Sequence, residues 1–151
     1  MLRDDIKIAT ITSMKAGDSA RTGTLRLMSA ALKNRDIELR TGTPPADDNV
    51  LVAEVLSKMA KQRRESIEMF VQGNRPELAD AERAELVIIE SFMPAQMAPD
   101  AAKAAIAALV TELGATSLKD MGRVMAAVKE RFAGQLDMGA AGGLVKAALA
   151  G

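Results

Sequence analysis

The side chains of this chain with the clearest capacity for chemistry are basic, because guanidinium and ammonium groups can bind phosphate. Arg26, Lys33 and Arg40 recur every seven residues. On a helix this spacing places them on nearly one face, about 10 Å apart along the axis. These three residues are candidate RNA-phosphate contacts. Three cations on one helix face are equally typical of a solvated surface, and that alternative stays open.

A second group of basic residues lies near the C-terminus. Lys119 and Arg123 are one helical turn apart and would share a face. We call the whole group the C-terminal basic set; its members are Lys119, Arg123, Lys129, Arg131 and Lys146. The set is a further candidate RNA-binding surface, against the alternative of solvated charge.

The segment "KQRRES", residues 61–66, interrupts an amphipathic helix pattern. The apolar seam of that helix comprises Val52, Leu56, Met59, Ile67 and Phe70. Arg63 occupies the middle of the seam, whereas Lys61 and Arg64 point away from it and are candidate RNA contacts or solvated charges. An unpaired buried arginine would cost several kcal/mol. Arg63 is therefore predicted to form a structural ion pair, with Glu38, Glu85 or Glu90 as candidate partners; contact with a bound anion is the alternative.

The composition argues against several classes of active site. The sequence has no Cys, which excludes thiolate nucleophiles and cysteine metal ligands. It also has no His, which is the commonest general base and the commonest transition-metal ligand. Neither Trp nor Tyr is present, and there are three Phe, so bases could hardly be read by aromatic stacking. The carboxylate pairs at 4–5 and 47–48 fit helix capping. We predict no catalytic residue, no metal site and no cofactor.

The periodicity predicts an all-α fold in two parts. Four helices are expected at 2–15, 19–41, 48–72 and 76–93, the second largely buried. Pro94 and Pro99 mark the boundary between an N-terminal helical domain, 1–94, and a small three-helix domain, 99–151. In the second domain, Asp100 is expected to cap the first helix, and Ser117 to Asp120 have capping-box form. Gly122 is expected to permit close helix approach.

Four blocks of the sequence resemble one family. They are "KQRRESIEMF", "GNRPELADAERAELVIIESFMPAQM", "DMGRVMAAVKERF" and "GLVKAAL". In this order they resemble the YqeY-like family (GatB/YqeY domain), which is similar to the C-terminal region of GatB, the B subunit of tRNA-dependent amidotransferase. The resemblance implies two helical parts and tRNA as partner, and it implies that tRNA docks on the C-terminal domain, which carries the C-terminal basic set. It also implies an amidotransferase-like label, that of a carbon–nitrogen ligase with glutamine as amido donor.

The sequence therefore favours a non-catalytic tRNA-binding or tRNA-associated helical module. Two alternatives stay open: an amidotransferase-like carbon–nitrogen ligase accessory, and an adaptor for a translation or amidotransferase protein partner. The N-terminal segment "MLRDDIKIAT" is charged, and no apolar run approaches the roughly 20 residues of a membrane span. We therefore expect a cytoplasmic protein that does not span a membrane. Its oligomeric state is not predicted.

Overall fold

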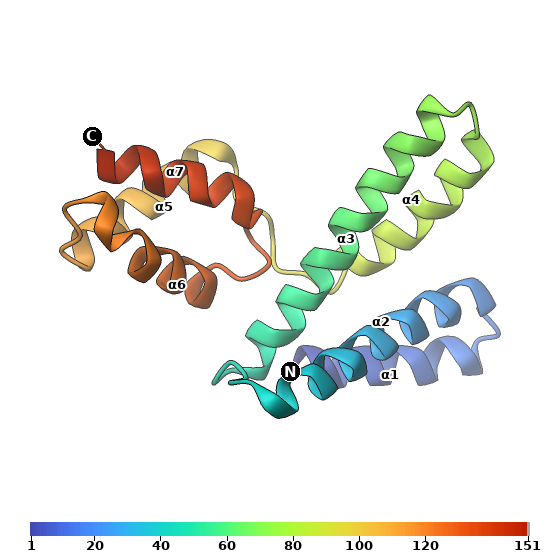
Figure 1. Cartoon of the computed structure of the whole chain (residues 1–151). Helices are drawn as coiled ribbons and strands as arrows, with labels where there is room; N and C mark the ends of the chain where they lie inside the picture. The colour runs from blue at the N-terminus through green and yellow to red at the C-terminus, as the bar shows by residue number, and fades with distance from the viewer. Residues whose placement is uncertain (151) are drawn as a thin grey trace. The chain divides into compact units, whose positions relative to one another are not determined.

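The computed structural model describes residues 1–150, and every regular element in that range is a helix (Figure 1). The predicted all-α fold class is confirmed. The chain divides into two compact units, the first from Met1 to Met93 and the second starting at Pro94.

The first unit consists of two antiparallel helical hairpins (Figure 1). Its elements are α1 (Leu2–Lys15), α2 (Ser19–Glu38), the short 3-10 helix η1 (Leu39–Thr41), α3 (Asp48–Gln72) and α4 (Pro76–Glu90). The Asp18 carboxylate accepts a hydrogen bond from the Arg21 amide and caps α2, and Asp47 caps α3 in the same way through Asn49. Pro76 starts α4, where its missing N–H costs nothing.

The core of the first unit lies between α1, α2, the first half of α3 and the end of α4. Its fully buried members include Leu25, Met28, Leu56 and Ile89. Each such side chain contributes roughly 1.5–3 kcal/mol by leaving water. The buried residues of α3 fall between Leu51 and Ala60. Beyond this point α3 continues beside α4, so the two helices form an arm with a thinner apolar contact (Figure 1).

The second unit is a small three-helix cluster. It contains α5 (Pro99–Glu112), the 3-10 turn η2 (Leu118–Asp120), α6 (Met121–Arg131) and α7 (Met138–Ala150). Its buried core consists of Ile106, Leu109, Val124, Val128, Ala141, Val145 and Leu149. The segment before α5 joins this unit through two hydrogen bonds. The Met97 amide donates to the Gln135 carbonyl at 3.0 Å, and the Gln96 amide group donates to the Gly134 carbonyl.

Helix ends differ from the prediction in several places. The second helix ends at Glu38 and the fourth at Glu90, each three residues early. Asp100 is not the N-cap of α5: Ala98 is, because Pro99 takes the first helical position and leaves Asp100 inside the first turn. The Asp120 carboxylate does accept from the Ser117 amide, at 3.4 Å, as a capping box requires.

Two packing expectations were also wrong. The second helix is buried on one face only, since Leu27 and Ile37 are exposed. Gly122 does not permit a close helix approach, because a Cβ built there would meet no other atom within 4 Å. Its helix crosses its neighbours on another face, so the propensity cost of this glycine has no packing explanation in the structure.

Candidate nucleic-acid interface

We call Arg26, Lys33 and Arg40 the α2 stripe; they form no ion pair in the described part of the chain. The Arg26 guanidinium contacts only a thioether, with its Nη2 atom 3.7 Å from Met14 Sδ. Lys33 is exposed and makes no hydrogen bond. Arg40 lies in η1, so the sevenfold helical spacing does not extend to it. The stripe therefore presents unpaired positive charge, aligned on α2 for its first two members.

Lys33 also borders a groove between α1 and α2, which we call the α1–α2 groove. The groove encloses about 180 Å³ and is lined by Arg3, Ile6, Lys7, Ser29, Leu32, Lys33 and Asp36. Ile6 and Leu32 are almost completely buried and form an apolar floor. The lining residues carry three positive charges and one negative charge, so the groove favours an anion.

The cation at one end of this groove is already engaged. Arg3 donates from Nε and Nη2 to Asp48, at 2.9 and 2.8 Å, and from Nη1 and Nη2 to Asp36, at 2.9 and 3.1 Å. These hydrogen bonds raise the pKa of Arg3, and the bond from Arg3 is the main cause that lowers the pKa of Asp48. Arg3 therefore links α1 to α2 and to the start of α3, and its single positive charge is shared between the two carboxylates.

The arginines of the C-terminal basic set are paired. Arg131 donates two hydrogen bonds to Glu112 on α5, at 2.6 and 2.7 Å, and this fork lowers the pKa of Glu112. Arg123 donates to the Leu113 carbonyl at 2.9 Å and to Asp120 at 3.2 Å. The pKa of Asp120 is lowered chiefly by the hydrogen bond from the Thr116 amide.

The lysines of the C-terminal basic set are exposed. Lys119 and Lys146 form no ion pair among residues 1–150, and Lys129 is exposed on the last turn of α6. The set thus divides into arginines bound to carboxylates or carbonyls and lysines at the surface. Of these lysines, Lys119 and Lys146 could contact a phosphate without first releasing a partner among residues 1–150.

The basic residues of the segment 61–66 lie in different surroundings: Arg63 is mostly buried, whereas Lys61 and Arg64 are exposed, as the helix pattern predicts. Arg63 has 17% of its side chain exposed, and its Nε donates to Glu85 Oε2 at 2.9 Å. The buried Oε2 of Glu82 lies 3.4 Å from the same Nε without hydrogen-bond geometry. Arg64 forms an exposed pair with Glu90 at 2.8 Å, and Lys61 is exposed.

Sequence reasoning did not single out three members of the α1–α2 groove: Arg3, Lys7 and Ser29. A partial signal was present, because Arg3 and Lys7 are four residues apart and share a helix face. The sequence does not show which residues of α2 lie opposite Arg3 and Lys7, because that depends on the antiparallel register of α1 and α2. That register pairs Arg3 with Asp36 and, further along, Ser13 with Thr22 through their hydroxyls at 2.7 Å.

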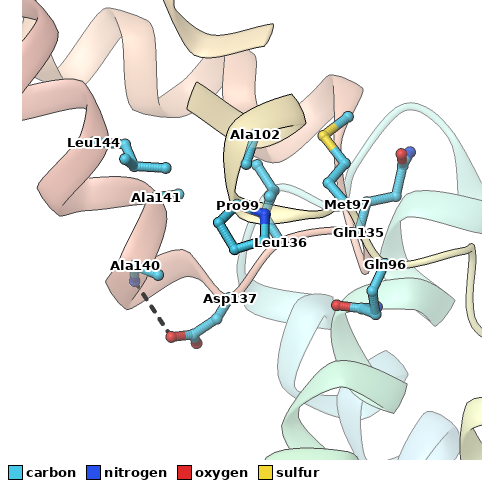
Figure 2. A pocket seen from close by; sticks show the side chains of 10 residues that line it. All are labelled: Gln96, Met97, Pro99, Ala102, Gln135, Leu136, Asp137, Ala140, Ala141 and Leu144. Carbon is cyan, nitrogen blue, oxygen red and sulfur yellow. Dashed lines mark hydrogen bonds between the residues drawn. The ribbon is translucent and has the colours of Figure 1, made fainter. Parts of the chain in front are cut away.

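The second unit has a cavity of its own, beside the segment that precedes α5 (Figure 2). It encloses about 320 Å³ and is lined by Gln96, Met97, Pro99, Ala102, Gln135, Leu136, Asp137, Ala140, Ala141 and Leu144. Most of this lining is apolar. Asp137 stands at the start of α7, where its Oδ2 atom accepts a hydrogen bond from the Ala140 amide at 3.3 Å.

Two searches of residues 1–150 gave negative results. No group of three or more carboxylate side chains is placed to hold a metal ion. No helix in this part of the chain is both long and apolar enough to cross a membrane.

The sequence is similar to several fungal proteins named "Altered inheritance of mitochondria protein 41, mitochondrial". Identity is 35% to the protein of Eremothecium gossypii, over 62% of this chain and 48% of the relative. It is 32% for Lachancea thermotolerans, over 74% and 55%, and 30% for Kluyveromyces lactis, over 79% and 59%. The chain thus spans about half the length of these relatives. The family described as Yqey-like protein matches residues 2–149, so the chain belongs to the YqeY-like family.

Proposed function

We propose that this protein is a non-catalytic helical module that binds tRNA through its phosphates. The observation that carries the proposal is the row of cations on α2 that no carboxylate neutralises. The resemblance of the family to the C-terminal region of the amidotransferase B subunit supports tRNA as the nucleic acid. Helical RNA presents phosphates and 2′-hydroxyls at its surface, and these can be held without aromatic stacking.

The distribution of charge supports a modest and local interface. The net charge of the whole chain is zero, so long-range attraction to RNA is weak. Residues 1–41 nevertheless hold eight Lys/Arg against five Asp/Glu, and residues 76–100 hold one against six. The α1–α2 hairpin is therefore the more basic part of the first unit, and the acidic segment would disfavour phosphate. This asymmetry makes the hairpin the better docking face.

Fluorescence anisotropy with labelled tRNA tests the proposal directly. The purified chain should bind tRNA in 50 mM salt. The affinity should fall as the salt concentration rises, because binding of Lys and Arg side chains to phosphates releases the salt cations that surround the RNA. Double-stranded DNA of equal length and an uncharged polymer serve as competitors. Absence of detectable binding in 50 mM salt at micromolar protein would contradict the proposal.

The non-catalytic part of the proposal has a separate test. Ammonia release from glutamine is measured for the chain alone and with tRNA. We expect no signal above buffer, because the sequence lacks the Cys and His that most often supply a nucleophile and its base. A tRNA-dependent release of ammonia would instead support the amidotransferase-like ligase function.

One observation favours a second function, that of an adaptor for a protein partner such as an amidotransferase subunit. The cavity in Figure 2 is largely apolar and adjoins Met97 and Pro99, at the start of the second unit. Such surfaces are typical of docking sites for apolar side chains. A pull-down with purified amidotransferase subunits, after nuclease treatment, checks this alternative; Leu144→Asp should abolish capture if the cavity is the docking site.

The cytoplasmic location stays a prediction. The fungal relatives carry the word mitochondrial in their names, and those names describe the relatives. Imaging of a tagged full-length chain in its own cells would decide the location.

A further inference from the structure

The α1–α2 groove brings unpaired cations from two helices to one cavity. Lys7 from α1 and Lys33 from α2 border the groove. Neither forms a hydrogen bond or an ion pair within the described chain, although Lys7 lies near enough to Asp48 to help lower the pKa of that carboxyl. Ser29, which also lines the groove, contributes a hydroxyl that has no hydrogen-bond partner among residues 1–150.

The carboxylates near the groove form no ion pair with these lysines. Asp36 and Asp48 are both hydrogen-bonded by Arg3, which holds each of them through two bonds. The guanidinium thus offsets one of the two negative charges and fixes the position of both carboxylates, so the two lysines leave this group of side chains with a net charge of +1. Lys7 and Lys33 are left as the positive charges available to a ligand.

The dimensions of the groove suit a compact anion. Its volume of about 180 Å³ corresponds to roughly six molecules of liquid water. This is room for a phosphate group and part of a substituent. The apolar floor of Ile6 and Leu32 excludes water from one side, which strengthens attraction between a bound anion and the lysines.

We propose that the α1–α2 groove is a phosphate-binding site. The ammonium groups of Lys7 and Lys33 donate to phosphate oxygens, and the Ser29 hydroxyl donates to a third. The phosphate can belong to an RNA backbone or to a free phosphate or phosphomonoester, and both share this recognition chemistry. The inference concerns the groove itself, and it holds or fails separately from the proposed tRNA function.

Titration of the ¹⁵N-labelled full chain with inorganic phosphate, followed by NMR, tests the site. Sodium chloride at equal ionic strength provides the reference. We expect saturable shifts in the amides of residues 3–7 and 29–36. In the variant Lys7→Gln/Lys33→Gln the apparent affinity for phosphate should fall at least fivefold.

The matched control is Lys15→Gln/Lys58→Gln. It removes the same charge from two exposed lysines that lie outside the groove, one of them on α1. This control should retain phosphate affinity to within a factor of two. Shifts spread evenly over all exposed cations, or equal losses in the two double variants, would overturn the site. Circular dichroism confirms that each variant is folded.

A parallel titration with tRNA identifies the source of the phosphate. If Lys7→Gln/Lys33→Gln weakens both inorganic phosphate and tRNA, the groove holds an RNA phosphate. If it weakens inorganic phosphate alone, the groove serves a free phosphate group. If the wild-type chain binds phosphate but no tRNA, the proposed function fails while the phosphate site stands.

Discussion

The α2 stripe and the C-terminal basic set contain similar residues in different surroundings. Arg26 and Lys33 project from α2 without a carboxylate, whereas Arg123 and Arg131 are held by Asp120 and Glu112. A phosphate must displace these internal partners before it can bind either arginine of the second unit. It meets no such competition on the stripe.

This difference shows why a count of basic residues is a poor guide to an interface. Glu112 lies 19 residues before Arg131, on another helix, and the packing of α5 against α6 brings the two together. A carboxylate of this kind is invisible in the local sequence. The resemblance to the amidotransferase B subunit directed attention to the C-terminal basic set, and the ion pairs direct it to the α1–α2 hairpin.

The most direct test of whether tRNA binds the α2 stripe or the C-terminal basic set is to remove three positive charges from each. We expect Arg26→Gln/Lys33→Gln/Arg40→Gln to lower tRNA affinity roughly a hundredfold in low salt and to reduce the salt slope by up to about three. The matched variant Arg123→Gln/Arg131→Gln/Lys146→Gln should lose clearly less, under about tenfold. Anisotropy titrations between 50 and 200 mM salt measure both. A larger loss in the C-terminal variant would return the interface to the second unit.

Arg63 provides a second test, because it is a cation that stabilises the fold through its ion pair with Glu85. Arg63→Ala strands the carboxylates of Glu82 and Glu85, one of them with a buried oxygen, and should lower the free energy of unfolding by about 2 kcal/mol. Arg64→Ala removes an exposed pair and should cost under about 1 kcal/mol. Urea unfolding followed by circular dichroism is suitable, since the chain has no Trp or Tyr. Equal losses of unfolding free energy in the two variants would show that the Arg63 ion pair contributes no more to stability than the exposed Arg64 pair.

The helices themselves were predictable, because their signals are local. Asp18, Asp47 and Pro76 mark helix starts by side-chain chemistry that acts within one turn. Errors arose where two local signals competed. At the start of α5, Asp100 favours the N-cap position and Pro99 favours the first helical position. Pro99 occupies its favoured position, so the N-cap is Ala98 and Asp100 lies inside the first turn.

Burial and pairing were less predictable, because they depend on which helices meet. Leu27 and Ile37 have the same side chains as core residues and are exposed, since no helix covers their face of α2. The α1–α2 groove likewise needs the register between two helices. Seam position did indicate a carboxylate partner for Arg63, because a mostly buried guanidinium needs one nearby, and one of the three candidates, Glu85, is that partner.

Asp48 gives a pH-dependent test of the one groove cation that is paired. The hydrogen bond from Arg3 lowers the pKa of Asp48 in the folded protein. Its contribution to stability is therefore present above the ordinary Asp pKa near 3.8 and is lost as pH falls through the lowered value. Asp48→Asn should lower the free energy of unfolding by no more than about 1 kcal/mol at pH 7, since the pair is partly exposed.

The loss in Asp48→Asn should shrink as pH falls through the lowered pKa of Asp48, because the carboxylate then loses its charge and the two proteins become alike at this position. Thermal unfolding by circular dichroism at pH 7 and at low pH measures it. Asp4→Asn is the control, since Asp4 also lies in the first turn of its helix but forms no ion pair among residues 1–150. A loss in Asp48→Asn that is unchanged at low pH would rule out the Arg3 pair as its cause.

The smallest effect concerns the balance of charge inside the groove. Asp36→Asn removes the one carboxylate that lines it and releases two hydrogen bonds of Arg3. Phosphate affinity should then rise about two- to threefold, which is the scale of one exposed charge. Glu38→Gln removes a more exposed carboxylate of α2 that pairs with Arg35 outside the groove. NMR titration with inorganic phosphate compares the two, and a rise in both variants alike would mean that the chain responds to net charge and that the groove has no local preference for phosphate.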